Sequence, residues 1–301
     1  MFIADTHADT LSKMTEFPRP PMDITVERLQ KAGTTLQTFA FFVGGSQKHD
    51  EVMRQNAKML HALEKIKQQP ITQVFDPRDA VEGKVQFMLS IEGSEIIEED
   101  LDSLALWRER GVRMASLTWN FENSLATPAN LDATSHLKPK GKEALRLMVS
   151  LGIAPDVSHL NDRGFYDILE MGLTPVASHS CARAICNHSR NLTDHQLQAL
   201  FQVGGYVGVN FYPHFLTKKM PATLDSVCDH IEHMLALGGE GKIGLGSDFD
   251  GIECAPIGLE SPLGVPALLE TLAKRGISKE IVEGIAGNNL LCYYDRVFPK
   301  G

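Results

Sequence analysis

One pattern recurs along the whole chain: a short run of apolar and β-branched residues is followed by a longer segment with helical periodicity. The short runs predict eight strands, at residues 2–5, 35–43, 86–91, 113–118, 153–157, 175–178, 205–210 and 242–247. The longer segments predict helices between them, including Asp50–Gln68, Leu101–Arg110, Lys140–Leu151, Asn161–Met171, Thr193–Val203, Ala222–Leu237 and Pro262–Arg275. Alternation of this kind indicates a parallel sheet, and eight strands favour its closure into a (β/α)8 TIM barrel. Periodicity alone leaves an open, doubly wound sheet as the alternative.

The composition does not divide the chain into parts. Of its 301 residues, 43% are hydrophobic and 22% are charged, which is enough apolar material for a large buried core. Glycine and proline lie at the turns between units, and no low-complexity linker or block of like charge separates them. We therefore predict a single barrel domain over residues 1–301.

Charge and cysteine content exclude several classes of protein. The net charge of -9 argues against a nucleic-acid partner, because binding to phosphates requires clustered lysine and arginine. The five cysteines are an odd number without a Cys-x-x-Cys pair, so neither a disulfide framework nor a thiolate zinc site is expected. A reducing cytoplasm is the location that we expect.

The N-terminal residues and the apolar stretches give no sign of a membrane. The segment Met1–His7 lacks the basic region, apolar region and cleavage site of a signal peptide. Thr38–Val43 is among the most apolar stretches, and it is much shorter than the ~20 residues of a membrane-spanning helix. We expect no transmembrane segment and no membrane partner.

Side chains that can bind metals or move protons fall at the C-terminal ends of the predicted strands. They follow the first, third, fifth, sixth and eighth strands, in the order His7 and Asp9, Glu92, His159, His179, and Asp248. In a closed barrel these strand ends share one rim, so residues distant in sequence would converge on one pocket.

This set of side chains fits a two-metal hydrolytic site. Imidazole nitrogen and carboxylate oxygen are the usual ligands of catalytic zinc. Three histidines and two carboxylates can hold two ions if one carboxylate bridges them. Two such ions can acidify a shared water to hydroxide, while one of them polarises the carbonyl to be cleaved. Each residue alone has a more ordinary explanation, such as a hydrogen-bonded histidine or a helix-capping Glu92, and only their conjunction favours a metal site.

Three other candidate motifs are weaker. Gly244-Leu245-Gly246 lacks the third glycine of a dinucleotide-binding loop. Cys181 and Cys186 lie near His179 without a visible catalytic triad, so buried structural cysteine is the better interpretation. His230 and His233 are one helical turn apart without a third ligand, which indicates a solvated helix face.

Eight short strings, in order and spanning nearly the whole chain, resemble the membrane (renal) dipeptidase family of zinc peptidases. These strings are Asp5-Thr6-His7-Ala8-Asp9-Thr10, Ser90-Ile91-Glu92-Gly93, Asp156-Val157-Ser158-His159, Ser178-His179-Ser180, Ser189-Arg190-Asn191-Leu192, Val209-Asn210-Phe211-Tyr212, Gly246-Ser247-Asp248-Phe249-Asp250-Gly251 and Gly287-Asn288-Asn289-Leu290-Leu291. The resemblance implies an amidohydrolase-like barrel with two Zn²⁺ ions, and weakly a homodimer. It also implies that Glu92 bridges both ions, that His7 and Asp9 complete one site, and that His159 and His179 complete the other.

The resemblance also assigns roles beyond the metal ligands. Arg190 matches the arginine that grips the substrate's terminal carboxylate, a role that suits the rigid guanidinium fork. Asp248 matches the carboxylate that transfers a proton from the attacking water to the leaving amine. Asp250 is a second choice for chemistry and otherwise supports the loop. Asn210 and Tyr212 are candidates to line the substrate pocket, with packing an equally good explanation.

One position departs from the family pattern. Mammalian dipeptidases carry a substrate-contacting histidine after a Leu-Thr pair, whereas this chain has Trp119 after Leu117-Thr118. An indole can donate one hydrogen bond but cannot ionise like imidazole. Stabilisation of the substrate carbonyl by this position is therefore in doubt, and neighbouring Asn120 is a candidate substitute donor.

The sequence thus predicts a zinc-dependent dipeptidase that hydrolyses dipeptides with a free C-terminal carboxylate, and it leaves open whether a D-residue at that end is accepted. Two alternatives remain at this point. One is a related two-metal amidohydrolase, such as an N-acyl amino acid deacylase or a lactonase. The other is a metal-binding homologue that has lost catalysis, against which the intact Asp248 argues.

Overall fold

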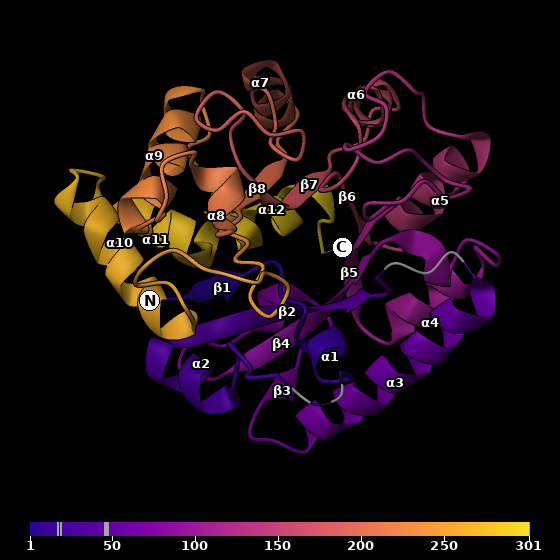
Figure 1. Cartoon of the computed structure of the whole chain (residues 1–301), viewed down its shortest axis with the longest axis horizontal. Helices are drawn as coiled ribbons and strands as arrows, with labels where there is room; N and C mark the ends of the chain where they lie inside the picture. The colour runs from indigo at the N-terminus through magenta and orange to yellow at the C-terminus, as the bar shows by residue number, and fades with distance from the viewer. Residues whose placement is uncertain (17, 19, 45–47, 301) are drawn as a thin grey trace.

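Eight parallel strands form a closed barrel in the computed structural model, which describes residues 1–300 except 17, 19 and 45–47 (Figure 1). In order around the ring they are β1 (Ile3–Asp5), β2 (Thr34–Phe42), β4 (Gln86–Glu92), β5 (Val112–Ser116), β6 (Ala154–Asp156), β7 (Val176–Ser180), β8 (Tyr206–Val209) and β9 (Ile243–Leu245). The ring closes because β1 pairs with β2 on one side and with β9 on the other. The predicted (β/α)8 barrel is confirmed, and the open sheet is excluded.

A ninth strand lies outside this ring. The two-residue β3 (Thr72–Gln73) pairs with Gln86 and Phe87 at the start of β4. The sequence did not predict it, because two residues are too few to show any periodicity.

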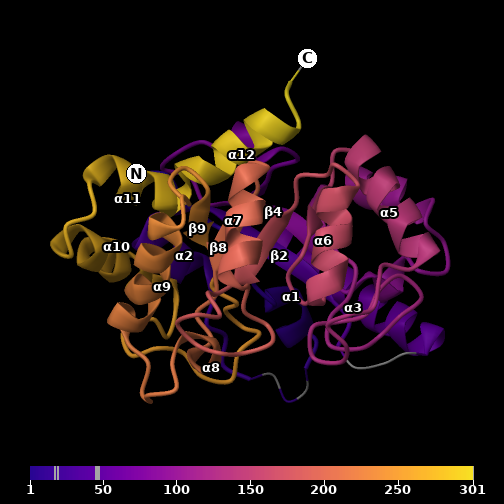
Figure 2. The same ribbon diagram turned by 90° about the horizontal axis from the view of Figure 1, so that it is seen from above.

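Helices surround the barrel (Figures 1 and 2). The α-helices are α1 (Thr10–Lys13), α2 (Val26–Ala32), α3 (His49–Lys67), α4 (Ser103–Glu109), α5 (Pro139–Ser150), α6 (Asp162–Glu170), α7 (Asp194–Gln202), α8 (Pro213–Leu216), α9 (Leu224–Ala236), α10 (Val265–Lys274), α11 (Lys279–Glu283) and α12 (Asn289–Val297). Short turns of 3-10 helix are η1 (Pro77–Asp79), η2 (Ser94–Ile96) and η3 (Pro262–Gly264), and η4 (Gly284–Asn288) is a π-helical turn. Each of the seven predicted helices corresponds to one of these.

Local chemistry fixes where several helices begin and end. The Thr193 hydroxyl accepts a hydrogen bond from the backbone N–H of Gln196, and together they form a capping box at the start of α7. Asn161 caps α6 in the same way, through Gly164. Helix α2 ends at Gly33, whose φ of 73° is the left-handed conformation that glycine adopts most easily. These helices therefore stop and start where their side chains satisfy the free backbone groups.

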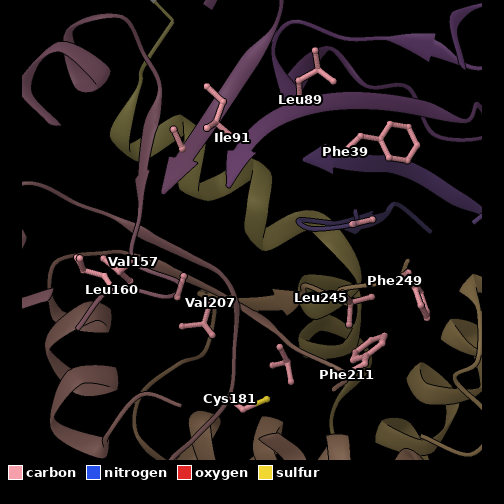
Figure 3. Packing of buried hydrophobic residues seen from close by; sticks show 14 of the residues in the cluster. Phe39, Leu89, Ile91, Val157, Leu160, Cys181, Val207, Phe211, Leu245 and Phe249 are labelled. Carbon is pink, nitrogen blue, oxygen red and sulfur yellow. The ribbon is translucent and has the colours of Figure 1, made fainter. Parts of the chain in front are cut away.

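The strands alternate between two faces, and the alternation points one set of side chains into the barrel. Outward-facing Leu89, Ile91, Val207 and Leu245 pack in the layer between strands and helices (Figure 3). The inward set forms a separate cluster that includes Met88 of β4. Because residues two apart share a face, Glu92 points inward like Met88, at the C-terminal end of the strand.

Helix α12 closes the N-terminal end of the barrel. Its Leu290, Tyr293 and Tyr294 belong to the same buried cluster as Met88. The Tyr294 hydroxyl donates to the carbonyl of Arg113, 2.9 Å away, at the start of β5. Figure 2 shows α12 on one side of the barrel and α8 on the other. The C-terminal ends of the strands therefore remain the open end.

No helix within the described part of the chain combines the length and apolar character needed to cross a membrane.

Candidate active site

The side chains predicted as metal ligands meet at the open end of the barrel. Glu92 lies at their centre, and its two oxygens face different partners. Its Oε2 is 3.4 Å from Nε2 of His7. Its Oε1 is 2.7 Å from Nε2 of His159 and 3.3 Å from Nε2 of His179. Glu92 therefore contacts all three histidines of the cluster.

Two further carboxylates stand beside His7. Its Nε2 is 3.7 Å from Oδ2 of Asp9 and 3.8 Å from Oδ1 of Asp248. Beside the other oxygen of Glu92, Nε2 of His159 and Nε2 of His179 are 2.9 Å apart. The rings of His7 and His179 stack with centroids 3.8 Å apart, which ties the two sides into one cluster.

Three atoms in this cluster that could bind a metal ion are buried without a hydrogen-bond partner. They are Nε2 of His7, Oδ1 of Asp9 and Oε2 of Glu92. Buried polar atoms are almost always hydrogen-bonded, and a buried charge without compensation is costly. Nitrogen and carboxylate donors that converge within 4.8 Å, as His7, Glu92 and His179 do, fit divalent cations such as zinc.

The electrostatics of the cluster also favour bound cations. Burial, reinforced by Glu92, raises the pKa of Asp9 to about 6. Burial likewise raises the pKa of Asp248 to about 7. For His7, burial lowers the pKa, but the adjacent carboxylates of Glu92 and Asp9 outweigh burial and raise the pKa well above its usual value. The carboxylates thus draw positive charge to this position, and a metal ion would supply it.

Neighbouring polar groups orient the histidines. Asn120 places its Oδ1 3.0 Å from Nδ1 of His159. Nδ1 of His179 is 2.8 Å from the hydroxyl of Ser178, which in turn donates to Asp156. With Nδ1 engaged in this way, each ring presents Nε2 to the cluster. Asn120 lines the cleft as predicted for a substrate contact, but its carbonyl oxygen already faces a histidine.

Asp248 is held from one side. Its Oδ2 accepts a hydrogen bond of 2.9 Å from the amide of Asn210, and Oδ1 lies toward His7. The side-chain carbonyl oxygen of Asn210 accepts a hydrogen bond from the backbone N–H of Tyr212. Asn210 is fully buried, so the structure places it behind Asp248, where it holds that carboxylate. Tyr212 lines the cleft, and its hydroxyl donates to Glu253.

Unusual backbone conformations occur at this end of the barrel. Among the described residues, the non-glycine residues with positive φ are His159 at 70°, Asp248 at 65° and Asp250 at 67°. Such conformations are strained for side chains with a Cβ and are concentrated at functional sites. They turn the chain sharply where β6 and β9 end.

Asp250 supports the loop after β9. Its carboxylate accepts hydrogen bonds from the Thr10 hydroxyl at 2.7 Å and from the backbone N–H of Asp23 at 2.7 Å. Lys13 lies 3.3 Å from it. These contacts tie the loop that carries Asp248 to α1, so the structure favours the supporting role for Asp250.

A cleft of about 330 Å³ opens over the cluster. Arg190 lines it and is buried, with 7% of its surface exposed, and its Nε has no hydrogen-bond partner. Trp119 also lines the cleft. Besides Gly251, which the sequence analysis named only within a family string, sequence reasoning missed six further lining residues: Phe42, Asn130, His188, Phe215, Ile252 and Glu253. Phe42 ends β2 and Phe215 lies in α8, whereas the others belong to loops. The positions of all six depend on the closed barrel, and their side chains form no motif by themselves.

The weaker sequence candidates lie apart from this cluster or serve packing. Cys181 is fully buried, and burial raises the pKa of its thiol far above the usual range. The prediction of a solvated face for His230 is wrong: this residue is fully buried. Its Nδ1 accepts from the backbone N–H of Ala182 at 3.0 Å, so it joins α9 to the loop after β7.

A closed parallel barrel with histidines and carboxylates gathered at the C-terminal ends of its strands defines the class: a (β/α)8 barrel protein with a candidate metal centre. Comparison with known families gives the particular one. Residues 1–300 match the family described as membrane dipeptidase, peptidase family M19, and the chain belongs to that family.

Individual relatives agree with this assignment. An uncharacterized dipeptidase of Schizosaccharomyces pombe is 37% identical over 227 residues, which cover 72% of this chain and 53% of the relative. The dipeptidase tcpJ of Claviceps purpurea is 36% identical over 214 residues, 69% of this chain and 50% of the relative. The chain thus spans about half the length of the curated relatives it matches.

Solved structures share the fold. A metallopeptidase from Rhodobacter sphaeroides, crystallised with a phosphinate mimic of the dipeptide L-Ala-D-Ala, superposes with a TM-score of 0.89. The two sequences are 24% identical, and the match covers 99% of each chain. At this level of identity the likeness shows the fold alone.

Proposed function

We propose that this protein is a zinc-dependent dipeptidase that hydrolyses dipeptides with a free C-terminal carboxylate. The observation that carries the proposal is the juxtaposition, in one cleft, of a buried metal-ligand set around Glu92 and the buried guanidinium of Arg190, whose Nε has no hydrogen-bond partner. The first can activate water and a carbonyl, and the second recognises a carboxylate.

Two groups of side chains around Glu92 would hold the ions. His7, Asp9 and Glu92 would hold one ion, and His159, His179 and Glu92 would hold the other. Two zinc ions at these positions would lower the pKa of a water and polarise the scissile carbonyl. Asn120 and Ser178 keep the imidazoles oriented for this task.

Arg190 selects and positions the substrate. A buried guanidinium without a partner pays a desolvation penalty that an incoming carboxylate offsets through two parallel hydrogen bonds. The Arg190 Cζ lies 5.5 Å from the centre of the Phe215 ring, which supports the side chain from one side. A substrate that lacks the free carboxylate would leave this charge unpaired and should therefore react slowly.

Asp248 is the proposed proton-transfer group. Asn210 holds its Oδ2, so Oδ1 is available to take a proton from the attacking water and to deliver it to the leaving amine nitrogen. Burial and the neighbouring carboxylates give it a raised pKa, which suits a group that both accepts and donates a proton.

The relatives support the substrate class. The two curated relatives above are named dipeptidases, and the Rhodobacter sphaeroides metallopeptidase was solved with a mimic of L-Ala-D-Ala. We therefore include dipeptides with a D-residue at the carboxyl end among the proposed substrates.

The test combines metal analysis with a substrate panel. We expect two zinc ions per chain and hydrolysis of free dipeptides that a chelator abolishes and added zinc restores. The panel should contain L-L and L-D dipeptides, their C-terminal amides, N-acyl amino acids and lactones. A preference for the amides, the N-acyl amino acids or the lactones would point to a different amidohydrolase, and a metal-loaded protein inactive on the whole panel would contradict catalysis.

A further inference from the structure

An aromatic surface forms part of the lining of the cleft. It consists of Phe42, at the end of β2, and Trp119, just after β5, and we call this pair the aromatic wall. Their ring centroids are 4.8 Å apart, with the planes at 62°, which is a favourable edge-to-face contact. Both residues are half-buried, so each offers an uncovered part of its ring to the cleft.

Neighbouring residues hold the wall in place. Trp119 also packs against Phe121, with centroids 5.6 Å apart, and stands 6.3 Å from the ring of His159. A Cβ on Gly44 would lie 2.6 Å from the Phe42 ring, so a glycine there lets this ring lie against the backbone. The wall is therefore a preformed apolar surface immediately beside the metal-ligand cluster.

The order of strands places Phe42, one of the two wall residues, across the barrel mouth from Arg190. Around the ring, β2 and β7 stand four places apart in either direction, so the ends of β2 and β7 face each other. Phe42 ends β2, and Arg190 lies in the loop that follows β7. The cluster around Glu92 occupies the space between them, since it draws on β1, β4, β6 and β7.

This order predicts how a dipeptide would lie in the cleft. With its carboxylate on Arg190 and its scissile carbonyl at the cluster, the C-terminal residue fills the Arg190 side. The N-terminal residue then extends beyond the cluster toward the wall. We propose that Phe42 and Trp119 bind the side chain of the N-terminal residue, and that they confer a preference for large apolar, above all aromatic, residues at that position. This inference rests on the proposed dipeptidase function.

The size of the effect follows from the chemistry of the wall. An apolar contact in a preformed pocket changes kcat/KM by about 10-fold to 200-fold. A glycine leaves the wall exposed, whereas a phenylalanine covers it. We therefore expect kcat/KM for Phe-Ala to exceed that for Gly-Ala by at least about tenfold.

The kinetic experiment compares matched dipeptides and matched variants. The selectivity ratio is kcat/KM for Phe-Ala divided by that for Gly-Ala, and the mirrored ratio uses Ala-Phe and Ala-Gly. We expect Trp119→Ala and Phe42→Ala each to lower the first ratio about tenfold and to change the mirrored ratio much less. Trp119→Phe should keep most of the selectivity. Phe75→Ala, at a phenylalanine 49% exposed and outside the cleft, is the control that should change neither ratio.

A binding measurement gives a second readout. The chain has two tryptophans, and Trp107 is 3% exposed in the core, so Trp119 is the one that a ligand in the cleft can reach. A phosphinate mimic of Phe-Ala should change the tryptophan emission of the zinc-loaded protein more than a mimic of Gly-Ala. Trp119→Phe should abolish the difference in emission while the Phe-Ala mimic still binds more tightly.

The outcomes separate the two proposals. If dipeptides are hydrolysed but the Phe-Ala preference is absent, or persists undiminished in Trp119→Ala and Phe42→Ala, the wall does not bind the N-terminal residue and the dipeptidase proposal stands. If these variants alter only the mirrored ratio, the wall binds the C-terminal residue instead. If the zinc-loaded wild type cleaves no dipeptide, both proposals fall.

Discussion

Asp248 combines three structural features. It is nearly enclosed, it has a left-handed backbone, and one of its oxygens is held by Asn210 while the other faces the metal-ligand cluster. Asp248→Asn keeps the shape and the contact with Asn210 but cannot accept the water's proton. We expect kcat to fall by about 10²-fold to 10⁴-fold, with the zinc content near that of the wild type. Wild-type turnover in this variant would remove Asp248 from the mechanism.

Glu95 carries a prediction about stability rather than turnover. Burial raises its pKa to about 7, and its Oε2 has no hydrogen-bond partner. Because the unfolded chain loses this proton near pH 4.5, stability falls as the pH rises from there to about 7. Glu95→Gln keeps an acceptor for Asn123 and removes this loss.

The variant should therefore match the wild type near pH 4.5 and exceed it by about 3 kcal/mol at pH 8. Urea unfolding at both pH values, with a chelator present so that bound cations do not contribute, measures the difference. Glu99→Gln, at an exposed position nearby, is the control. An equal difference between variant and wild type at the two pH values would show that Glu95 does not titrate in this range.

At the scale of elements, the loop after β9 approaches the cluster so closely that it tolerates no side chain at Gly251. A Cβ there would lie 2.2 Å from Oδ2 of Asp9 and 2.6 Å from Oδ1 of Asp248. Gly251→Ala must displace one of these carboxylates, and we expect zinc affinity to fall by about 10-fold to 100-fold. Competition with a chromophoric chelator measures it.

The matched control is Gly172→Ala. Gly172 has a φ of 74° and open space around it, so its substitution strains the backbone at the surface and touches no ligand. Its zinc affinity should equal that of the wild type. If Gly251→Ala binds zinc equally well, the close approach of this loop is not needed for the metal centre.

The same scale shows what could be predicted from the sequence. The eight barrel strands were predicted to within a few residues, because buried parallel strands are dense in apolar side chains and end at polar ones. Glu92 and His159 could be placed at strand ends for this reason, and closure of the barrel then brings them together. Helix α12 was not predicted, although its Tyr293 and Tyr294 are fully buried.

The remaining parts of the cleft depend on contacts between segments distant in sequence. Phe42 was predicted as strand, but nothing local reveals that its ring meets Trp119 across two loops. Asn210 was a candidate pocket residue, and only the fold shows that its amide holds Asp248. The periodicity of the sequence predicts which residues are buried and which form helices and strands. These contacts, in contrast, arise only when the ring of strands closes.

For the molecule as a whole, one end of the barrel is open to the cleft and the other end is closed by a helix. The C-terminal ends of the strands carry the cleft, and α12 seals the N-terminal ends through Tyr293 and Tyr294. Tyr294→Ala opens a cavity and removes the hydrogen bond to Arg113. We expect it to lower the free energy of unfolding by about 3–5 kcal/mol.

Activity per folded molecule should change little in Tyr294→Ala, because the cleft lies at the opposite end. Denaturant unfolding and steady-state kinetics well below the unfolding transition separate the two effects, with Phe75→Ala as an exposed aromatic control. A large loss of kcat at full folding would show that the two ends are coupled.

The left-handed backbone at His159 and Asp248 has a consequence for the engineering of a more heat-stable variant of this protein. Glycine at either position would relieve about 1 kcal/mol or more of conformational strain, so a screen for heat resistance alone would favour it. Each such gain would remove an imidazole or a carboxylate that the proposed mechanism requires. Thermal stability and turnover therefore favour different residues at these two positions, so a variant selected for one property should be tested for the other.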